Sequence, residues 1–274
     1  MTGVSFEPNA ECARPSMAHW LSINTECPGS AWLDAVSPIF AAGAPRLVAL
    51  NIGANKGYMI SSWLQRFGAY PQDSPNKWHR MLIQARGAKM PPTDNDLCGV
   101  CRACKDNPVR HKTKRPVELH AFELLPPNAE VIRKAVSQIG LVNLVNPARL
   151  GPKWTLTQPH PFVAVSQAAV SNTSGTAWIP GTHDDKIGKE DVSATLNSKP
   201  SGAFIPVEML SIDNYLEHAG IERVAFASVD TEGFDALVLE GMQRTLSRGL
   251  IDVLEFECDS LARSQNQETK CSRP

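Results

Sequence analysis

The chain has 274 residues, enough for one large α/β domain with a substantial core or for two small domains. Its hydrophobic content of 42% and charged content of 20% are those of an ordinary soluble globular protein, and its net charge of −1 indicates no overall attraction to nucleic acid or to an anionic membrane. No apolar run approaches the ~18 residues needed to span a bilayer, and the first ten residues lack a secretion signal. We therefore expect a soluble, cytoplasmic protein with no membrane span.

Residues 1–45 contain five prolines and little sustained periodicity. Two interpretations fit this segment: short helices packed on the edge of a domain, around Trp20 and from Trp32 to Phe40, or a leader that is only partly ordered.

The most informative stretch follows at residues 47–58, where an apolar run passes into a glycine-rich turn and then into a helical pattern. Val48 and Leu50 suit a strand buried on both faces, as in a parallel sheet. Gly53 and Gly57 allow turn conformations that a Cβ would obstruct and let the backbone close on a ligand. Taken alone, such a turn also fits a plain connection from strand to helix.

Residues 71–116 form a polar and basic sequence broken by six prolines. The stretch between Gly53 and Glu123 is far longer than the about 20 residues typical of a strand-helix-strand unit before its ribose-binding acid. We interpret residues 71–116 as an inserted lobe that lies outside the core.

After the insertion, strand and helix patterns alternate, which predicts right-handed crossovers and a mostly parallel sheet with helices on both faces, a Rossmann-like α/β fold. Residues 181–203 are polar without an apolar period and predict a mobile loop. The expected strands are 117–123, 141–145, 162–170, 207–210, 224–230 and 251–257, and the expected helices begin near Pro126, Tyr215 and Asp235, the last running to Arg248.

Three strand ends carry groups suited to ligand binding, because ligands of such sheets bind at the carboxyl ends of the strands. They are the turn from Gly53 to Gly57, Glu123, and Asp230 with Glu232. A carboxylate at Glu123 can accept hydrogen bonds from both hydroxyls of a ribose, or it can be an acid favoured by the dipole of the next helix. Two acids at an otherwise apolar strand end indicate a functional site more strongly than one solvated acid does.

The chain resembles the FkbM-type methyltransferases in six motifs that occur in the same order, across residues 47–257 apart from the insertion. Six ordered motifs are far more specific than any one of them. They begin at Asn51, Ala121, Ala169, Leu210, Val229 and Leu254, and read NIGANKGY, AFELLPPN, AVSNTSG, LSIDNYL, VDTEGFDALVLEG and LEFE.

The resemblance implies a class I enzyme that uses S-adenosylmethionine, with O-methylation of a hydroxyl on a small molecule or glycan as the reaction. By the same resemblance, Gly53, Asn55 and Gly57 bind the methionine end of the cofactor. Asn51 begins this motif. Glu123 binds the ribose, and the remaining roles fall to Ala168 and Ala169 near the adenine and to Asp230 and Glu232 at the methyl-transfer end.

The chain departs from the family pattern at three places. Asn51 stands where the family usually has Asp, and Ser228 stands where a Lys commonly precedes the acidic motif. Only seventeen residues, 258–274, follow the methyltransferase domain that we assign to residues 46–257, whereas this fold normally continues with a helix and a terminal pair of strands. Two interpretations fit: the product is truncated and lacks those strands, or its sheet is completed differently. The alternative to an enzyme is an inactive, truncated module that retains the fold for binding or regulation.

Three cysteines cluster within the insertion at Cys98, Cys101 and Cys104, and His111 follows them. Three thiolates and an imidazole are enough for a tetrahedral structural zinc site. Free thiols in a polar loop fit the sequence equally, and an iron–sulfur cluster would use the same residues.

The insertion is rich in Lys and Arg, which fits a solvated loop or a contact with an anionic partner. Trp78 is the only tryptophan that interrupts it, so we do not expect a stacking platform for nucleic acid. A small-molecule or glycan acceptor is the partner we expect, and the sequence leaves the oligomeric state open.

Overall fold

The structure is a computed structural model that describes residues 31–40, 44–68, 75–86, 111, 113–141, 143–144, 161–181, 195–196 and 198–256. Its centre is a six-stranded sheet in which all neighbouring strands are parallel. This arrangement confirms the predicted Rossmann-like α/β class. The strand order is β10 (Ile251–Phe256), β9 (Val224–Val229), β1 (Leu47–Ile52), β2 (Val117–Glu123), β4 (Phe162–Gln167) and β3 (Asn143–Leu144).

Strand β1 lies in the middle of this sheet and pairs with β2 on one side and β9 on the other. The chain builds outward from β1 through β2 to β4, and later returns to the other side of β1 to add β9 and β10. The strand order therefore reverses at β1. The carboxyl end of such a switch point is where open α/β sheets bind their ligands.

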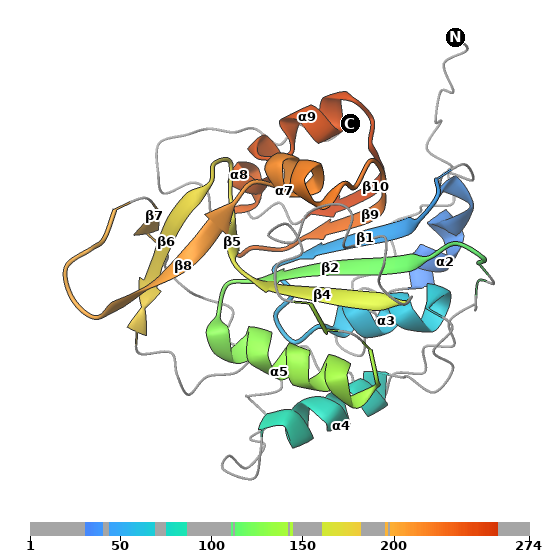
Figure 1. The fold of residues 1–274 in the computed structure, drawn as a ribbon, viewed down its shortest axis with the longest axis horizontal. Helices are drawn as coiled ribbons and strands as arrows, with labels where there is room; N and C mark the ends of the chain where they lie inside the picture. Colours follow the sequence, from blue (N-terminus) through green and yellow to red (C-terminus); the bar gives the residue numbers. More distant parts are fainter. Residues whose placement is uncertain are drawn as a thin grey trace, which may run out of the picture.

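Alternate side chains of the central strands enter two separate cores, because successive residues of a strand point to opposite faces. On one face Leu47 and Ala49 pack with helices α3 (Tyr58–Phe67), α4 (Pro75–Arg86) and α5 (Pro126–Gln138). On the other face Val48 and Leu50 pack in a second core. Figure 1 shows a second group of helices on that side of the sheet. That group is α7 (Ile212–Ala219), α8 (Asp235–Glu240) and α9 (Gln243–Ser247).

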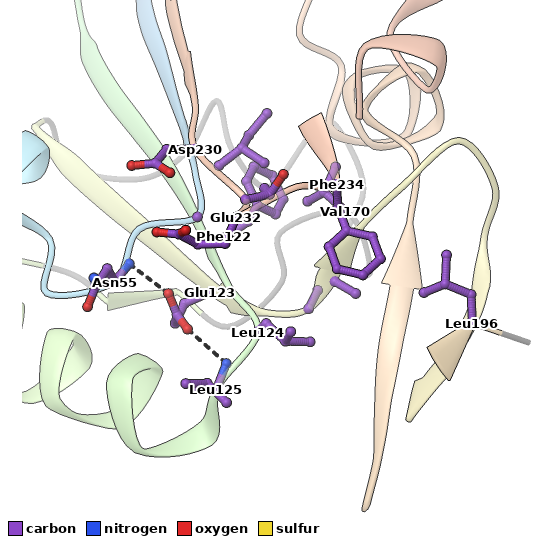
Figure 2. A pocket seen from close by; sticks show the side chains of 15 residues that line it. Asn55, Phe122, Glu123, Leu124, Leu125, Val170, Leu196, Asp230, Glu232 and Phe234 are labelled. Carbon is purple, nitrogen blue, oxygen red and sulfur yellow. Dashed lines mark hydrogen bonds between the residues drawn. The ribbon is translucent and has the colours of Figure 1, made fainter. Parts of the chain in front are cut away.

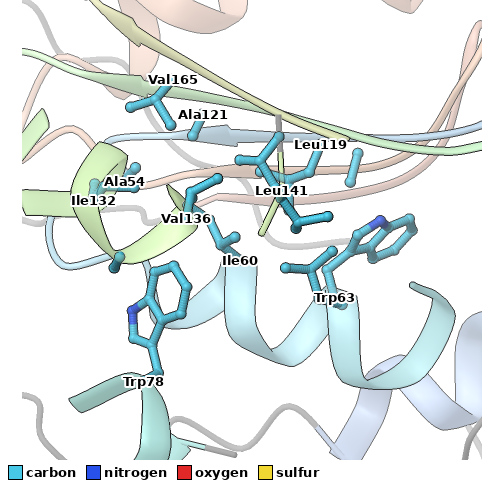
Figure 3. Close-up of a cluster of buried hydrophobic side chains, with 14 of the residues drawn as sticks. Ala54, Ile60, Trp63, Trp78, Leu119, Ala121, Ile132, Val136, Leu141 and Val165 are labelled. Carbon is cyan, nitrogen blue, oxygen red and sulfur yellow. The ribbon is translucent and has the colours of Figure 1, made fainter. Parts of the chain in front are cut away.

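Helix α4 corrects the prediction that residues 71–116 lie wholly outside the core. Trp78 is fully buried, and Met81 and Leu82 join it at the three- and four-residue spacing of a helix face. The Trp78 indole donates a hydrogen bond to the carbonyl of Lys56 at 2.8 Å, and its ring lies against α3 and α5 (Figure 3). This short apolar period is flanked by prolines and basic residues, so the overall composition of residues 71–116 did not indicate a buried helix.

The N-terminal side of the domain contains helix α2 (Ala31–Val36) and the 3₁₀ helix η1 (Ser37–Ile39). Phe40 is buried against Trp63 and Phe67, with ring centroids 5.8 and 5.5 Å away. For residues 31–40, the structure thus has the edge-packed helix that was one of the two interpretations. Residues 1–30 lie outside the described part of the chain.

A second, four-stranded sheet extends from the main one (Figure 1). The sequence pattern predicted one strand from Phe162 to Val170, but the strand is interrupted at Ala168, where the chain leaves the main sheet for the small one. Thr195 and Leu196 form a strand within the segment predicted as a polar loop. The order is β5 (Ala169–Val170), β8 (Phe204–Leu210), β6 (Gly175–Pro180) and β7 (Thr195–Leu196).

The single helix predicted from Asp235 to Arg248 is two helices, α8 and α9, separated at Gly241. A Cβ on Gly241 would lie 2.1 Å from the carbonyl oxygen of Ser171, so only glycine permits this close approach. The Gly241 carbonyl accepts a hydrogen bond from the backbone N–H of Asp213 at 2.9 Å rather than from a following turn of helix. Contact with two distant segments therefore ends α8.

Candidate active site

Three strand ends meet at the switch point through backbone hydrogen bonds. The N–H groups of Gly53 and Ala54 both donate to the carbonyl of Phe122, at 3.0 and 2.9 Å. The N–H of Asp230 donates to the carbonyl of Ile52 at 2.9 Å. The turn after β1 is thereby joined to the end of β2 and to the end of β9, as the sequence motifs predicted.

The two glycines of the turn have different structural roles. Gly53 has φ of +82°, and a Cβ there would lie 1.7 Å from the carbonyl oxygen of Asp230. Gly57 has φ of +73° at the start of α3, and a Cβ there would lie 2.9 Å from the Trp78 ring. Gly53 therefore brings two loops of the site together, whereas Gly57 lets the core helix α4 pack beneath the turn.

A pocket opens at the meeting point of these strand ends, with about 790 Å³ of space that includes part of the open solvent (Figure 2). Many of the predicted site residues line it, but Asn51 and Gly57 lie outside the lining. Asn51 is only 5% exposed and sits within β1. The predicted residues in the lining are Gly53, Asn55, Glu123, Ala168, Ala169, Asp230 and Glu232.

Glu123 is held by donors from the surrounding backbone. Its Oε2 accepts from the N–H of Asn55 at 2.6 Å, and its Oε1 accepts from the N–H of Leu125 at 2.8 Å (Figure 2). The Asn128 side chain adds a longer bond to Oε1 at 3.4 Å. Asn55 has φ of 46°, a left-handed conformation that aims its N–H at the carboxylate.

Burial dominates the electrostatics of Glu123. The residue is 5% exposed, and burial raises the pKa of its carboxyl to about 7, although the hydrogen bonds from Leu125, Asn55 and Asn128 act in the opposite direction. A carboxyl with this pKa exchanges its proton near neutral pH, so a ligand that donates to the carboxylate would shift it toward the ionised form.

The acidic loop after β9 forms another part of the pocket. Asp230 and Glu232 are exposed side chains in its lining, and Glu232 has φ of 53°, which is uncommon outside glycine. Thr231 donates from its hydroxyl to Asp235 at 3.0 Å, which fixes the loop against α8. The loop thus presents two carboxylates at the mouth of the pocket.

Comparison with protein families gives a match to the Methyltransferase FkbM domain over residues 101–270, more than half of the chain. The chain belongs to the FkbM methyltransferase family. No curated protein and no solved structure gave a match. The matched region begins after the turn at Gly53, and the structure joins that turn to Phe122 and Asp230 of the matched region.

Several apolar residues of the pocket were not predicted from the sequence. Phe122, Leu124 and Leu125 flank Glu123 in the chain, so their position beside the predicted site was the available signal. Leu196 had no such signal, because it is isolated in a polar segment and reaches the pocket only through strand pairing. The other lining residues that were not selected are Ile52, Val170, Thr231 and Phe234.

The predicted zinc ligands fall largely outside the described residues, since Cys98, Cys101 and Cys104 are not among them. In the described part of the chain, no group of three or more His, Cys, Asp or Glu residues is arranged to hold a metal. His111 stacks on Phe67 with centroids 5.0 Å apart, and its Nε2 lies 3.1 Å from a carboxylate oxygen of Asp34. Its Nδ1 lies 3.4 Å from the Ser37 hydroxyl.

Among the described helices of this FkbM family member, none has the length and apolar composition required to cross a membrane.

Proposed function

We propose that the chain binds S-adenosylmethionine in this pocket and methylates a hydroxyl of a small molecule or glycan. The observation that carries the proposal is the buried Glu123 carboxylate at the switch point, next to an apolar wall that includes Leu124 and Ala169. A nucleoside combines a hydroxylated sugar with a flat, largely apolar base, so it fits a pocket that pairs a carboxylate with apolar side chains.

Each predicted residue then has a role in holding the cofactor. Glu123 accepts from the ribose hydroxyls, Ala168 and Ala169 border the base, and the turn of Gly53 and Asn55 faces the methionine end. Asn51 and Gly57 act from outside the lining by shaping that turn, since Gly57 admits Trp78 beneath it.

Bound S-adenosylmethionine supplies an electrophilic methyl group on a sulfonium. The chain contributes alignment of the acceptor, which is a large part of catalysis for a displacement of this kind. Asp230 accepts a hydrogen bond from the acceptor hydroxyl and takes its proton as the new bond forms. Glu232 flanks it at the same pocket mouth and helps to orient the acceptor.

Calorimetry with S-adenosylmethionine and S-adenosylhomocysteine tests cofactor binding. Glu123→Ala and Gly53→Val are expected to weaken both ligands, the first by removing the ribose acceptor and the second by forcing the loops apart. Leu246→Ala, at an exposed position on α9, is the control and should bind as wild type does. Folded wild-type protein that gives neither heat nor a thermal shift would refute the proposal.

Methyl transfer is tested with radiolabelled S-adenosylmethionine and fractionated extracts. Labelling of a hydroxyl-bearing product that is lost in Asp230→Ala supports the enzyme. Cofactor binding without labelled product in any extract supports the alternative, a module that retains the fold without turnover. Methylation of nitrogen or carbon would retain the enzyme class but reject the hydroxyl acceptor.

We also propose one structural zinc ion bound by Cys98, Cys101, Cys104 and His111. A polar segment with few apolar side chains gains order from a metal, and four protein ligands leave no position for an activated water. For Nε2 of His111 to bind the zinc ion, His111 must give up its contact with Asp34. Elemental analysis decides the matter: zinc near zero, or zinc unchanged by Cys101→Ser with Cys104→Ser, rejects the site.

A further inference from the structure

The polar lining of the pocket comes from the main sheet, whereas part of its apolar lining comes from the small sheet. Its polar groups, including Asn55, Glu123 and Asp230, follow the strands of the main sheet. Its apolar wall includes Ala169 of β5 and Leu196 of β7, both in the small sheet. In Figure 2 Leu196 lies beyond Leu124, on the side of the pocket away from Asn55 and Asp230.

Strand pairing and packing hold Leu196 in this wall. Leu196 pairs with Ala177 of β6 in the antiparallel register of β6 and β7. Its side chain is partly buried against a cluster of Ala169, Ala177 and Met209, and Leu124 packs on the same cluster. Leu196 is thus supported by β5, β6 and β8, while one part of it faces the pocket.

We propose that Leu196 contacts the purine base of the cofactor and is a residue that determines affinity for it. This inference rests on the proposed function, which puts the ribose at Glu123 and the methionine end near Asn55. The base is attached to the side of the ribose opposite the methionine end. It therefore extends toward Leu124, the residue that follows Glu123, and toward the apolar wall behind Leu124. A flat base gains affinity there from apolar contact.

The test measures binding of S-adenosylhomocysteine and 5′-methylthioadenosine to the full chain by calorimetry. The two probes share the purine and ribose but differ in the amino-acid end. Leu196→Ala should weaken both by the same factor, about five- to tenfold, because shortening the side chain removes apolar area from the contact. Leu196→Met, which keeps an apolar side chain of similar volume, should stay within about threefold of wild type.

Ile205→Ala is the matched control. Ile205 lies on β8 of the same sheet but packs with Leu125, Ile179 and Val207 instead of lining the pocket. Its substitution removes a similar apolar volume from the small sheet and, because Ile205 itself is outside the pocket lining, should leave both affinities within about twofold of wild type. Equal losses in Ile205→Ala and Leu196→Ala would mean that the sheet, and not the contact, is responsible.

Two further outcomes would overturn the inference. Unchanged affinity for both probes in Leu196→Ala would place Leu196 away from the cofactor. Loss of affinity for S-adenosylhomocysteine alone would place it at the amino-acid end. Wild-type protein that binds neither probe would reject the proposed function itself, which separates that failure from a failure of the role of Leu196. Should Leu196→Ala not fold, Leu196→Val provides the same comparison with a smaller loss.

Discussion

Strand β2 carries two buried glutamates in contrasting environments. Glu118 is fully buried near the start of the strand, where both of its carboxylate oxygens accept from Arg46 Nη1, at 3.0 and 3.1 Å. His120 adds a contact from Nε2 at 3.4 Å. Glu123 ends the same strand, and its partners are backbone N–H groups, chiefly those of Asn55 and Leu125, and one amide side chain.

The two environments shift the pKa in opposite directions. Burial raises the pKa of both carboxyls, but the hydrogen bond and charge of His120 and the charge of Arg46 lower that of Glu118 overall. The neutral donors around Glu123 do not offset burial, so its pKa rises to about 7. A carboxylate with cationic partners is a fixed part of the framework, whereas one held by dipoles beside a pocket is available to a ligand.

The fixed carboxylate also supports the pocket from behind. His120 Nδ1 lies 2.8 Å from the Tyr215 hydroxyl, and the Tyr215 ring meets Phe122 edge to face with centroids 4.7 Å apart. Phe122 lines the pocket. The ionic group at Glu118 is therefore connected to the pocket through packed rings, without contact with a ligand.

The largest expected effect comes from Glu118→Gln, which removes the fully buried carboxylate that faces the partly buried Arg46. Stability to chemical denaturation should fall by about 3–5 kcal/mol, the usual cost of breaking a buried ion pair from one side. Glu130→Gln is the control, because Glu130 pairs with Lys134 at an exposed position and should change stability by less than about 0.5 kcal/mol. A loss below about 1 kcal/mol for Glu118→Gln would contradict the structural role of the pair.

The next effect is the pH dependence of stability that Glu123 produces. Its folded pKa of about 7 exceeds its unfolded value, so the folded chain binds more protons between the two. The free energy of unfolding therefore has a negative slope against pH. It falls by about 3 kcal/mol in total as pH rises from about 4.5 to above 7. Glu118, with its lowered pKa, acts in the opposite sense and at more acidic pH, because its contribution is lost as pH falls.

Denaturation curves at half-unit steps from pH 5 to 8 measure this slope, with Glu123→Gln as the comparison. The amide removes the titration, although it also leaves one backbone N–H without an acceptor and makes the variant less stable than wild type at pH 5 by about 1–3 kcal/mol. The difference between wild type and variant should therefore narrow as pH rises. Parallel curves would mean that Glu123 titrates normally.

A smaller effect concerns ligand affinity. Ribose hydroxyls donate to a carboxylate, so binding of S-adenosylhomocysteine should favour ionised Glu123 and release a proton below pH 7. Affinity should rise about tenfold from pH 6 to pH 8, which corresponds to about 1.4 kcal/mol. Calorimetry in buffers of different ionisation enthalpy measures the proton release. A wild-type affinity that is flat over this range would place the ribose elsewhere.

The sequence predicted the parts of this site that are local in the chain. Gly53, Glu123 and Asp230 each end an apolar strand, and parallel strands bring their carboxyl ends to one edge, so their meeting followed from the motifs. The environment of each side chain could not be predicted from the motifs. Glu118 and Glu123 lie on one strand with similar neighbours in sequence, and their difference comes from Arg46 and from backbone N–H groups that side-chain identity does not encode.

The parts that sequence analysis missed depend on contacts between distant segments. Trp78 is buried because Gly57 leaves room for its ring, and α8 ends where Gly241 meets Ser171. Leu196 reaches the pocket through its register with Ala177. Hydrophobic periodicity reports burial along one element, but it does not report which other element covers it.

The smallest expected effect tests the dipoles around Glu123. Asn128 donates to Oε1 at 3.4 Å, a long bond that favours the ionised form by about 0.5 kcal/mol. Asn128→Ala should therefore raise the pKa of Glu123 further, move the midpoint of the stability slope up by about 0.3 pH unit, and weaken S-adenosylhomocysteine about twofold at pH 7. Ser137→Ala is the control, since Ser137 lies exposed on the same helix and donates only to its own helix at Arg133. A midpoint that moves down, or one that moves equally in the control, would show that Asn128 does not stabilise the ionised carboxylate. On the Glu123 side, the asymmetry between the two glutamates would then rest on backbone N–H groups.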